Sequence, residues 1–242
     1  ATVASAIAVT DGNTDGDGDF GQTATGKVTV NVGNVVASAS GVVLFDVTVN
    51  SDVASGTQVS NVASVNYESP DGTPRGPTAS PQANVTAQQV AAVSVTPETA
   101  AKNGTAGGTV DYPATVTNNG NGSDTFALST SNLPTGWTAK IFRDTDNDGE
   151  LDTNETEEVT STGSVSAAGT YKVIVVVTVP GDAEVDSTGG VKLTATSGAD
   201  NTKSDFGTYT TTVQLAVLGL TKSASPSNPA PGDTVTYTVR LL

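Results

Sequence analysis

The chain contains no cysteine, no histidine and no methionine among its 242 residues. Without cysteine it can form neither a disulfide nor a thiolate metal site, and it offers no thiol nucleophile. Without histidine it lacks the commonest general base and the commonest transition-metal ligand, so a Ser-His-Asp triad and a zinc-binding H-E-x-x-H site are both excluded. We therefore expect that the chain is not an enzyme.

Positive charge and long apolar runs are also scarce. Ten Lys and Arg residues stand against 25 Asp and Glu residues, which gives a net charge of −15. This charge disfavours binding to nucleic-acid phosphates or anionic lipids and favours binding of divalent cations. No run of about 18 apolar residues is present, so we expect no membrane insertion. Because the chain begins with Ala1, it is predicted to be the mature part of a secreted protein that works at the cell surface.

The abundant residues are those of β-structure and turns. Val and Thr favour strands, whereas Gly, Asn, Asp and Pro mark the turns between them, and no segment has a convincing helical period. Val59–Tyr67 alternates as a strand should, Ser69–Pro81 is predicted to be a Pro/Gly-rich loop, and the apolar run Val173–Val177 is predicted to be a central buried strand. The sequence therefore predicts an all-β protein.

Two parts of the chain repeat each other. Val47–Asp52 matches Val177–Asp182 at an offset of about 130 residues, and a second strand begins after Gly56 or Gly190 in both. This register predicts two tandem immunoglobulin-like β-sandwiches, of which the first is incomplete. The predicted parts are an incomplete sandwich over 1–88, a complete one over 89–217, and a donor-like β segment over 218–242.

The motifs of these parts resemble known families. Gly219–Lys222, Pro226 and Pro231–Val239 resemble the opening of the repeat domain called domain of unknown function 11, and Val47–Tyr67 resembles its closing half. Thr115–Gly120 and Leu133–Trp137 resemble CARDB-like and α-galactosidase-associated sandwiches. The resemblance implies tandem β-sandwiches of prokaryotic cell-surface filament or stalk proteins, and it says little about biochemistry.

The segment from Gly219 to Leu242 resembles the opening of a β-domain, and the repeat register predicts that the N-terminal domain lacks such an opening. Thr234–Leu242 alternates, which places Val235, Tyr237, Val239 and Leu241 on one face. We therefore expect this segment to pair with the first domain of an identical subunit, so that subunits join head-to-tail into a filament. The alternative is an excised segment of a long tandem-repeat adhesin stalk or envelope-layer protein.

The sharpest chemical motif is the acidic loop 144–155. Oxygen-bearing side chains occupy loop positions 1, 3, 5, 9 and 12, with Gly149 at position 6, as in calcium loops. The expected ligands are the carboxylates of the three aspartates, the backbone carbonyl at position 7, the position-9 carboxylate and a bidentate position-12 glutamate. In that order they are Asp144, Asp146, Asp148, Glu150, Asp152 and Glu155. The alternative is an acidic, solvated turn.

A degenerate copy of this loop lies at 11–22. Its expected calcium ligands are Asp11, Asn13, Asp15, Asp17 and Asp19. Glycine again stands at position 6, but position 12 is Gln22, which cannot provide a bidentate carboxylate. The sequence thus predicts one calcium ion in 144–155 and a second, weaker site in 11–22. Calcium would stiffen the filament and screen the negative charge that opposes subunit contact.

Overall fold

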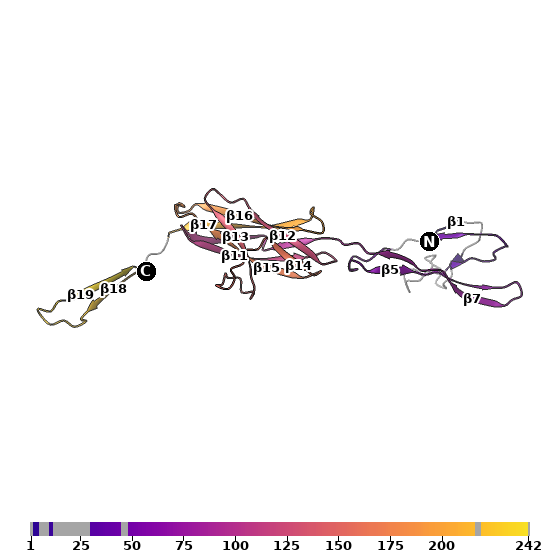
Figure 1. Ribbon diagram of the computed structural model, residues 1–242, viewed down its shortest axis with the longest axis horizontal. Coiled ribbons are helices and arrows are strands. Elements are labelled where there is room, and N and C mark those ends of the chain that lie inside the picture. Colours follow the sequence, from indigo (N-terminus) through magenta and orange to yellow (C-terminus); the bar gives the residue numbers. More distant parts are fainter. Residues whose placement is uncertain (1, 5–9, 12–29, 45–47, 216–218, 242) are drawn as a thin grey trace. The chain divides into compact units, whose positions relative to one another are not determined.

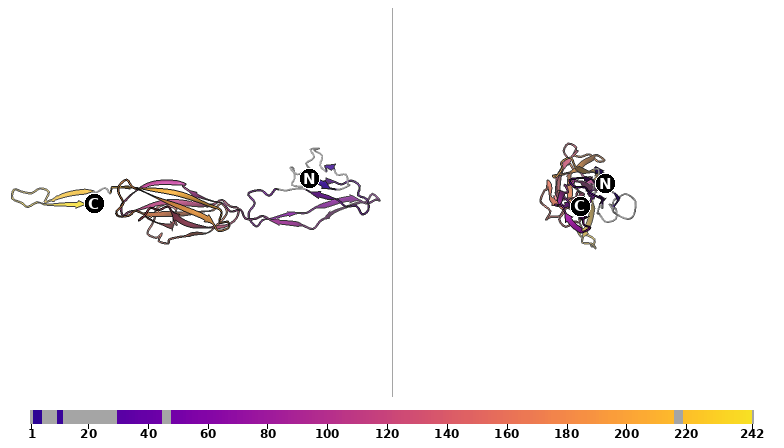
Figure 2. Two further views of the ribbon diagram at one scale, coloured as in Figure 1. Left: turned by 90° about the horizontal axis from the view of Figure 1, so that it is seen from above. Right: turned by 90° about the vertical axis from the view of Figure 1, so that its right-hand side faces the viewer.

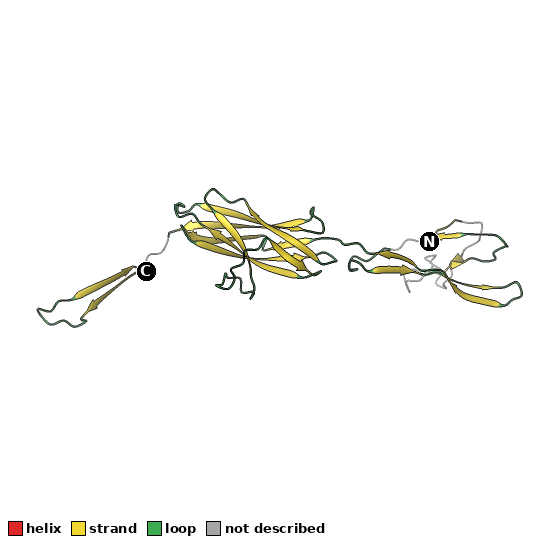
Figure 3. Ribbon diagram, in the orientation of Figure 1, coloured by secondary structure: helices red, strands yellow, loops and turns green. Residues whose placement is uncertain are grey.

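The computed structural model describes residues 2–4, 10–11, 30–44, 48–215 and 219–241, and in these residues all regular structure is β-strand (Figure 3). The all-β prediction is therefore confirmed. Within the same residues no helix is long and apolar enough to cross a membrane. Residues 1–51 and 52–242 form two compact units. The domain boundaries predicted at 88 and 217 remain predictions.

Residues between Val93 and Gln214 form a two-sheet sandwich (Figures 1 and 2). Its five-stranded sheet has the order β10 (Thr99–Thr105), β17 (Ser204–Gln214), β16 (Thr188–Ser197), β12 (Asp124–Ser131) and β14 (Ser161–Val165). Its four-stranded sheet has the order β13 (Thr138–Arg143), β15 (Thr170–Thr178), β11 (Thr109–Asn118) and β9 (Val93–Thr96). All pairs are antiparallel except β10 with β17, which is parallel.

The predicted central strand Val173–Val177 is confirmed as part of β15, which pairs with β13 on one side and β11 on the other. Val173, Val175 and Val177 belong to the hydrophobic core between the sheets. Ile174 points to the opposite face, yet it is also fully buried. Its partner across the ladder is Pro113, which lies 3.3 Å from the place where a Cβ at Gly149 would be. The loop after β13 therefore packs over the outer face of this sheet.

The core is built mainly from alternating positions of the long strands. Its largest fully buried side chains are those of Tyr112, Tyr209, Phe126 and Leu193, together with valines of β9, β11, β15 and β16. Trp137 is partly buried against this cluster. At Gly189 an added Cβ would lie 2.5 Å from the Trp137 ring, so the ring lies directly against the glycine backbone. Side chains of Val and Leu size each contribute roughly 1.5–3 kcal/mol when fully buried.

The described parts outside the sandwich are two-stranded ladders. In residues 1–51 β1 (Thr2–Ala4) pairs with β4 (Val42–Leu44), and β2 (Thr10–Asp11) pairs with β3 (Val30–Asn31). In residues 52–242 β5 (Gln58–Asn61) pairs with β8 (Ala83–Thr86), β6 (Ser64–Glu68) with β7 (Pro74–Ala79), and β18 (Leu220–Ser225) with β19 (Thr236–Leu241). The first four of these ladders lie within the part predicted to be an incomplete sandwich.

Two strand predictions in this part are wrong in detail. The predicted single strand Val59–Tyr67 is interrupted at residues 62–63, because three residues (80–82) face these two and Pro81 has no N–H to donate. The predicted loop Ser69–Pro81 contains β7, which pairs with β6 across a turn closed by the bond from the Gly72 amide to the Ser69 carbonyl (2.8 Å). A strand with a partner on one side only tolerates prolines, since its outer edge needs no donor.

The two buried tyrosines of the core allow a matched test of hydrogen bonding. Their rings stack with centroids 5.2 Å apart. The Tyr112 hydroxyl lies 2.8 Å from both the Thr210 carbonyl and Thr211 Oγ1, whereas the Tyr209 hydroxyl has no partner among the described residues. We expect Tyr112→Phe to lower the free energy of unfolding by about 1–2 kcal/mol and Tyr209→Phe to leave it nearly unchanged, as measured by urea denaturation at neutral pH. Equal losses in both variants would contradict this reading.

The buried tyrosines also predict a loss of folding stability at alkaline pH. Burial raises the pKa of Tyr209 to about 12, above the value of about 10 for an exposed tyrosine. The unfolded chain then loses the tyrosine proton first, so stability is full below about pH 10 and falls as the pH rises towards 12. Tyr209→Phe should remove part of this fall, which denaturation across this pH range would measure.

Candidate metal centre

The acidic loop leaves and rejoins the same edge of the four-stranded sheet. Asp144 directly follows β13, and its amide donates to the Lys172 carbonyl on β15 (3.2 Å). On the return, Phe142 and Glu158 form an isolated antiparallel bridge, and the Val159 amide donates to the Ile141 carbonyl (2.8 Å). Both ends of the loop are therefore fixed to the sheet by backbone hydrogen bonds.

Three of the predicted ligands come together at the start of this loop. Asp144, Asp146 and Asp148 each offer a carboxylate oxygen, and these oxygens lie within 4.8 Å of one another. Asp144 is 6% exposed, while Asp146 and Asp148 are exposed. Three carboxylates this close repel one another unless a cation lies between them. The cluster could therefore hold a metal ion, and its donors are all hard oxygens.

Local hydrogen bonds hold the three aspartates in place. Asp144 Oδ1 accepts from the Asn147 amide (2.6 Å), Asp146 Oδ1 from the Asp148 amide (3.3 Å) and Asp148 Oδ1 from the Glu150 amide (2.8 Å). The chain reverses through left-handed backbone at Asn147 (φ 68°) and Gly149 (φ 81°). Asparagine and glycine are the residues that adopt this conformation most readily, so the sequence is suited to the turn.

Glu155, the predicted bidentate ligand, closes the loop by hydrogen bonds. Its Oε1 accepts from the Thr145 amide (2.5 Å) and the Thr145 hydroxyl (3.0 Å), and its Oε2 accepts from the Asp152 amide (3.2 Å). The Thr145 amide is the main reason why the pKa of this 4%-exposed carboxyl is lowered. Its stabilising effect is present above the ordinary pKa of glutamate and is lost as the pH falls through the lowered value. Glu155 is not among the carboxylates whose oxygens lie within 4.8 Å of one another, and its role as an ion ligand stays a prediction.

The two remaining predicted ligands of this loop have different positions. The Asp152 carboxyl lies beside Asp146, and the pKa of Asp152 is raised, first by a hydrogen bond between the two carboxyls and then by burial and the neighbouring negative charges. Asp152 is not among the three carboxylates whose oxygens lie within 4.8 Å of one another, so its part in holding an ion stays a prediction. The backbone amide of Glu150 bonds to Asp148, and its carbonyl, the predicted ligand atom, stays a prediction.

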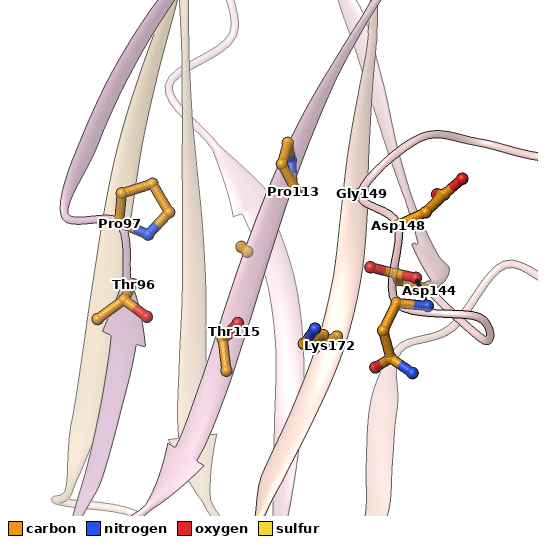
Figure 4. A pocket seen from close by; sticks show the side chains of 10 residues that line it. Thr96, Pro97, Pro113, Thr115, Asp144, Asp148, Gly149 and Lys172 are labelled. Carbon is orange, nitrogen blue, oxygen red and sulfur yellow. Dashed lines mark hydrogen bonds between the residues drawn. The ribbon is translucent and has the colours of Figure 1, made fainter.

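A shallow pocket of about 360 Å³ adjoins the cluster (Figure 4). Thr96, Thr115 and Lys172 occupy one row across β9, β11 and β15, and Asp144 continues this row beyond β15. Lys172 is the one cation among the residues that line the pocket. Sequence reasoning missed this lysine, because only the register of β13 with β15 places it beside a loop that lies some 28 residues earlier.

The predicted second site at 11–22 is mostly outside the described residues. The backbone of Asp11 lies in β2, opposite Val30. Asn13, Asp15, Asp17 and Asp19 lie outside the described residues. A second calcium ion in this loop therefore stays a prediction.

Comparisons with known proteins do not assign the chain to a family. No family model matches the chain, and no curated protein matches it. Similar solved structures include a family 123 glycoside hydrolase from Clostridium perfringens (10% identity, TM-score 0.37, 53% of this chain and 28% of that chain) and the human CEP192 PapD-like domain 7 (14%, 0.32, 52% and 87%). Another is the secreted serine protease VesC from Vibrio cholerae (16%, 0.30, 52% and 22%).

The chain spans less than a third of the hydrolase and of the protease. TM-scores this low carry no argument, and neither the resemblance to domain of unknown function 11 nor that to CARDB-like sandwiches is tested by these matches. The function must therefore be argued from this chain's own residues.

Proposed function

We propose that the chain is a structural subunit of an extracellular prokaryotic filament that polymerises head-to-tail by β-strand complementation and is stiffened by calcium. The observation that carries this proposal is the exposed apolar face of the hairpin β18–β19. Its register places Leu220 opposite Leu241, Lys222 opposite Val239 and Ala224 opposite Tyr237, all on one face. Leu220, Tyr237, Val239 and Leu241 are 54–68% exposed.

A two-stranded hairpin with such a face is marginally stable alone in water. Its other face carries Thr221, Ser223, Thr238 and Arg240, so the hairpin is amphipathic. Such a face, with unpaired backbone groups along both edges, is a template for pairing with another chain. Covering this face in a sheet of a second subunit would remove both the apolar exposure and the open edge.

The same chain offers a surface of matching character. The ladders β5–β8 and β6–β7 leave Val65, Tyr67 and Val85 at 50–62% exposure. These ladders also have two strands each and would gain stability from a third. We propose that the partner is an identical subunit, whose hairpin adds to this part. A surface and its complement at different places on one chain give a heterologous contact, which propagates as a fibre unless it closes into a ring.

Calcium is the ion that we propose for the aspartate cluster. The donors are all oxygens, they lie at positions 1, 3 and 5 of a loop with Gly149 at position 6, and Asp152 lies beside Asp146. A bound divalent cation would offset part of the −15 charge, which otherwise opposes contact between subunits. We further propose that the chain acts outside the cell and has no enzymatic activity, in line with its lack of histidine and cysteine.

The alternative proposal is a segment of a long tandem-repeat adhesin stalk or envelope-layer protein. The repeat of Val47–Asp52 in Val177–Asp182 favours it. In that case the hairpin pairs along one polypeptide and not between separate chains. Purified subunits would then stay monomeric.

A matched pair of hairpin variants tests the filament proposal. Val239→Lys places a second charge opposite Lys222, on the face that carries Leu220, Tyr237 and Leu241, whereas Thr238→Lys places the same charge on the opposite face of the same strand. We expect the native chain and Thr238→Lys to form fibres visible by negative-stain electron microscopy, and we expect Val239→Lys to form none. A chain ending at residue 217 should behave as Val239→Lys does. If the native chain remains a monodisperse monomer, the proposal that this chain polymerises is wrong and the repeat-stalk alternative is favoured.

A further inference from the structure

The loop between β11 and β12, residues 119–123, contacts chain segments well before the sandwich. The Ser55 amide donates to the Asn121 carbonyl (2.9 Å), and the Asn121 amide donates to the Val90 carbonyl (3.2 Å). The Gln89 side-chain amide donates to the Ser123 carbonyl (2.9 Å). The loop therefore joins the sandwich to two chain segments, around residues 55 and 89–90, that lead into the β5–β8 ladder.

The Asn121 side chain makes three of its four possible hydrogen bonds at this joint. Its Nδ2 donates to the carbonyls of Val53 (3.0 Å) and Gln88 (3.1 Å), and its Oδ1 accepts from the Val90 amide (2.7 Å). Together with its backbone bonds, one residue ties residues 53–55 and 88–90 to the sandwich. The β5–β8 ladder continues into this joint, because Gly56 donates to Ala87 and Ala87 to Thr57 (both 2.9 Å).

The close approach depends on two glycines. A Cβ at Gly120 would lie 2.6 Å from the Val90 carbonyl oxygen, and one at Gly122 would lie 2.9 Å from Ser55 Cβ. At its base the loop is held by Asn118, which is fully buried and donates to the carbonyls of Gly122 and Val165 (both 2.9 Å). The buried Asn118 thus fixes the shape of the loop, and the two glycines leave room for the close approach of residues 55 and 90.

We infer that residues 118–123 are a polar clamp that stiffens the joint between the β5–β8 ladder and the sandwich, with Asn121 as its positioning residue. The bonds given above join amide, carbonyl and carboxamide groups, and no ion pair is among them. The stiffness should therefore not depend on salt or on calcium. The clamp lies within a single chain, so it does not depend on polymerisation.

The clamp also has a consequence for modification. Asn121-Gly122-Ser123 matches the triplet that accepts N-linked glycans. In the folded chain the two hydrogens of this carboxamide are both donated, and a glycan would replace one of them. A glycan at Asn121 is therefore incompatible with the clamp.

Asn121→Ala and Asn119→Ala form the test pair. Asn119 is an exposed neighbour in the same loop whose side chain makes one bond, to Ser94 Oγ (2.8 Å). Amide hydrogen exchange is measured on each variant at a concentration where the chain is monomeric. We expect Asn121→Ala to speed exchange of the Val90 and Ser55 amides about tenfold or more, with a matching rise in proteolysis at residues 87–92. Core amides of β15 and β16 should keep their protection, and Asn119→Ala should resemble the native chain.

Unchanged exchange at Val90 and Ser55 in Asn121→Ala would overturn the inference. So would an equal loss in Asn119→Ala, or a loss at the core amides of the same size as that at the joint. Asn121→Asp guards against a general folding defect, because it keeps the shape and the acceptor but turns a carboxylate towards the carbonyls of Val53 and Gln88. It should loosen the joint at least as much as Asn121→Ala does.

Discussion

Calcium is expected to raise the melting temperature of the native chain, and a chelator is expected to lower it. Asp144, Asp146 and Asp148 repel one another in the absence of a cation, and Asp152 adds to this repulsion from beside Asp146. A ligand present at about 100 times its dissociation constant stabilises the folded state by about 2.7 kcal/mol. For a sandwich of this size that corresponds to a shift of roughly 5–10 °C, measured by thermal denaturation with added calcium and with chelator.

Two double variants with equal charge changes separate ion binding from general electrostatics. Asp144→Ala with Asp146→Ala removes two of the three clustered carboxylates, so the response to calcium and to chelator should disappear. Asp182→Ala with Glu184→Ala removes two exposed acidic groups from another loop and should keep the full response. An unchanged melt of the native chain in calcium and chelator would exclude the metal site. An equal response to magnesium would argue against calcium in particular, because magnesium demands a tighter octahedral set of ligands.

Much of the sandwich follows from local sequence pattern. Val173–Val177 is apolar on both faces, and only a strand with neighbours on both sides and a covered outer face buries all five residues. The cause is different for β10, which the local pattern does not predict. β10 contains Ala, Lys, Asn and Gly with few apolar residues, and its formation depends on parallel pairing with β17, about 109 residues later in the chain. Such pairing leaves no signal in a short window of sequence.

The residues of the candidate site also differ in how well the local sequence predicts their roles. The spacing of Asp144, Asp146 and Asp148 around a turn brings their oxygens together, so local sequence predicts the cluster. The role of Glu155 was less predictable, because a carboxylate at position 12 can bind an ion or accept amide hydrogens. The structure shows hydrogen bonds to this carboxylate from Thr145 and Asp152, and its part in ion binding stays a prediction. Position alone does not distinguish these two uses of the same oxygens.

Asn118→Ala is expected to destabilise the sandwich strongly. Asn118 is fully buried, and its Nδ2 donates to the carbonyls of Gly122 and Val165 while its Oδ1 accepts from the Gly120 amide (2.9 Å). Alanine would leave these three backbone groups without their partner; the bond to Val165 is buried and the other two are partly buried. An unsatisfied buried group costs about 1–3 kcal/mol. We expect a loss of about 3–5 kcal/mol in the free energy of unfolding, measured by urea denaturation. Asn119→Ala, which removes one exposed bond, should lose less than about 1 kcal/mol.

The size of this effect follows from where the three bonds lead. Asn118 ends β11 in the four-stranded sheet, Val165 ends β14 in the five-stranded sheet, and Gly120 and Gly122 lie in the clamp loop. One carboxamide therefore connects both sheets to the loop that carries Asn121. Asn118→Ala should lower global stability and also loosen the joint, whereas Asn121→Ala should loosen the joint alone. If Asn118→Ala costs no more than Asn119→Ala, or leaves exchange at the Val90 amide unchanged, this dependence of the clamp on the buried asparagine is wrong.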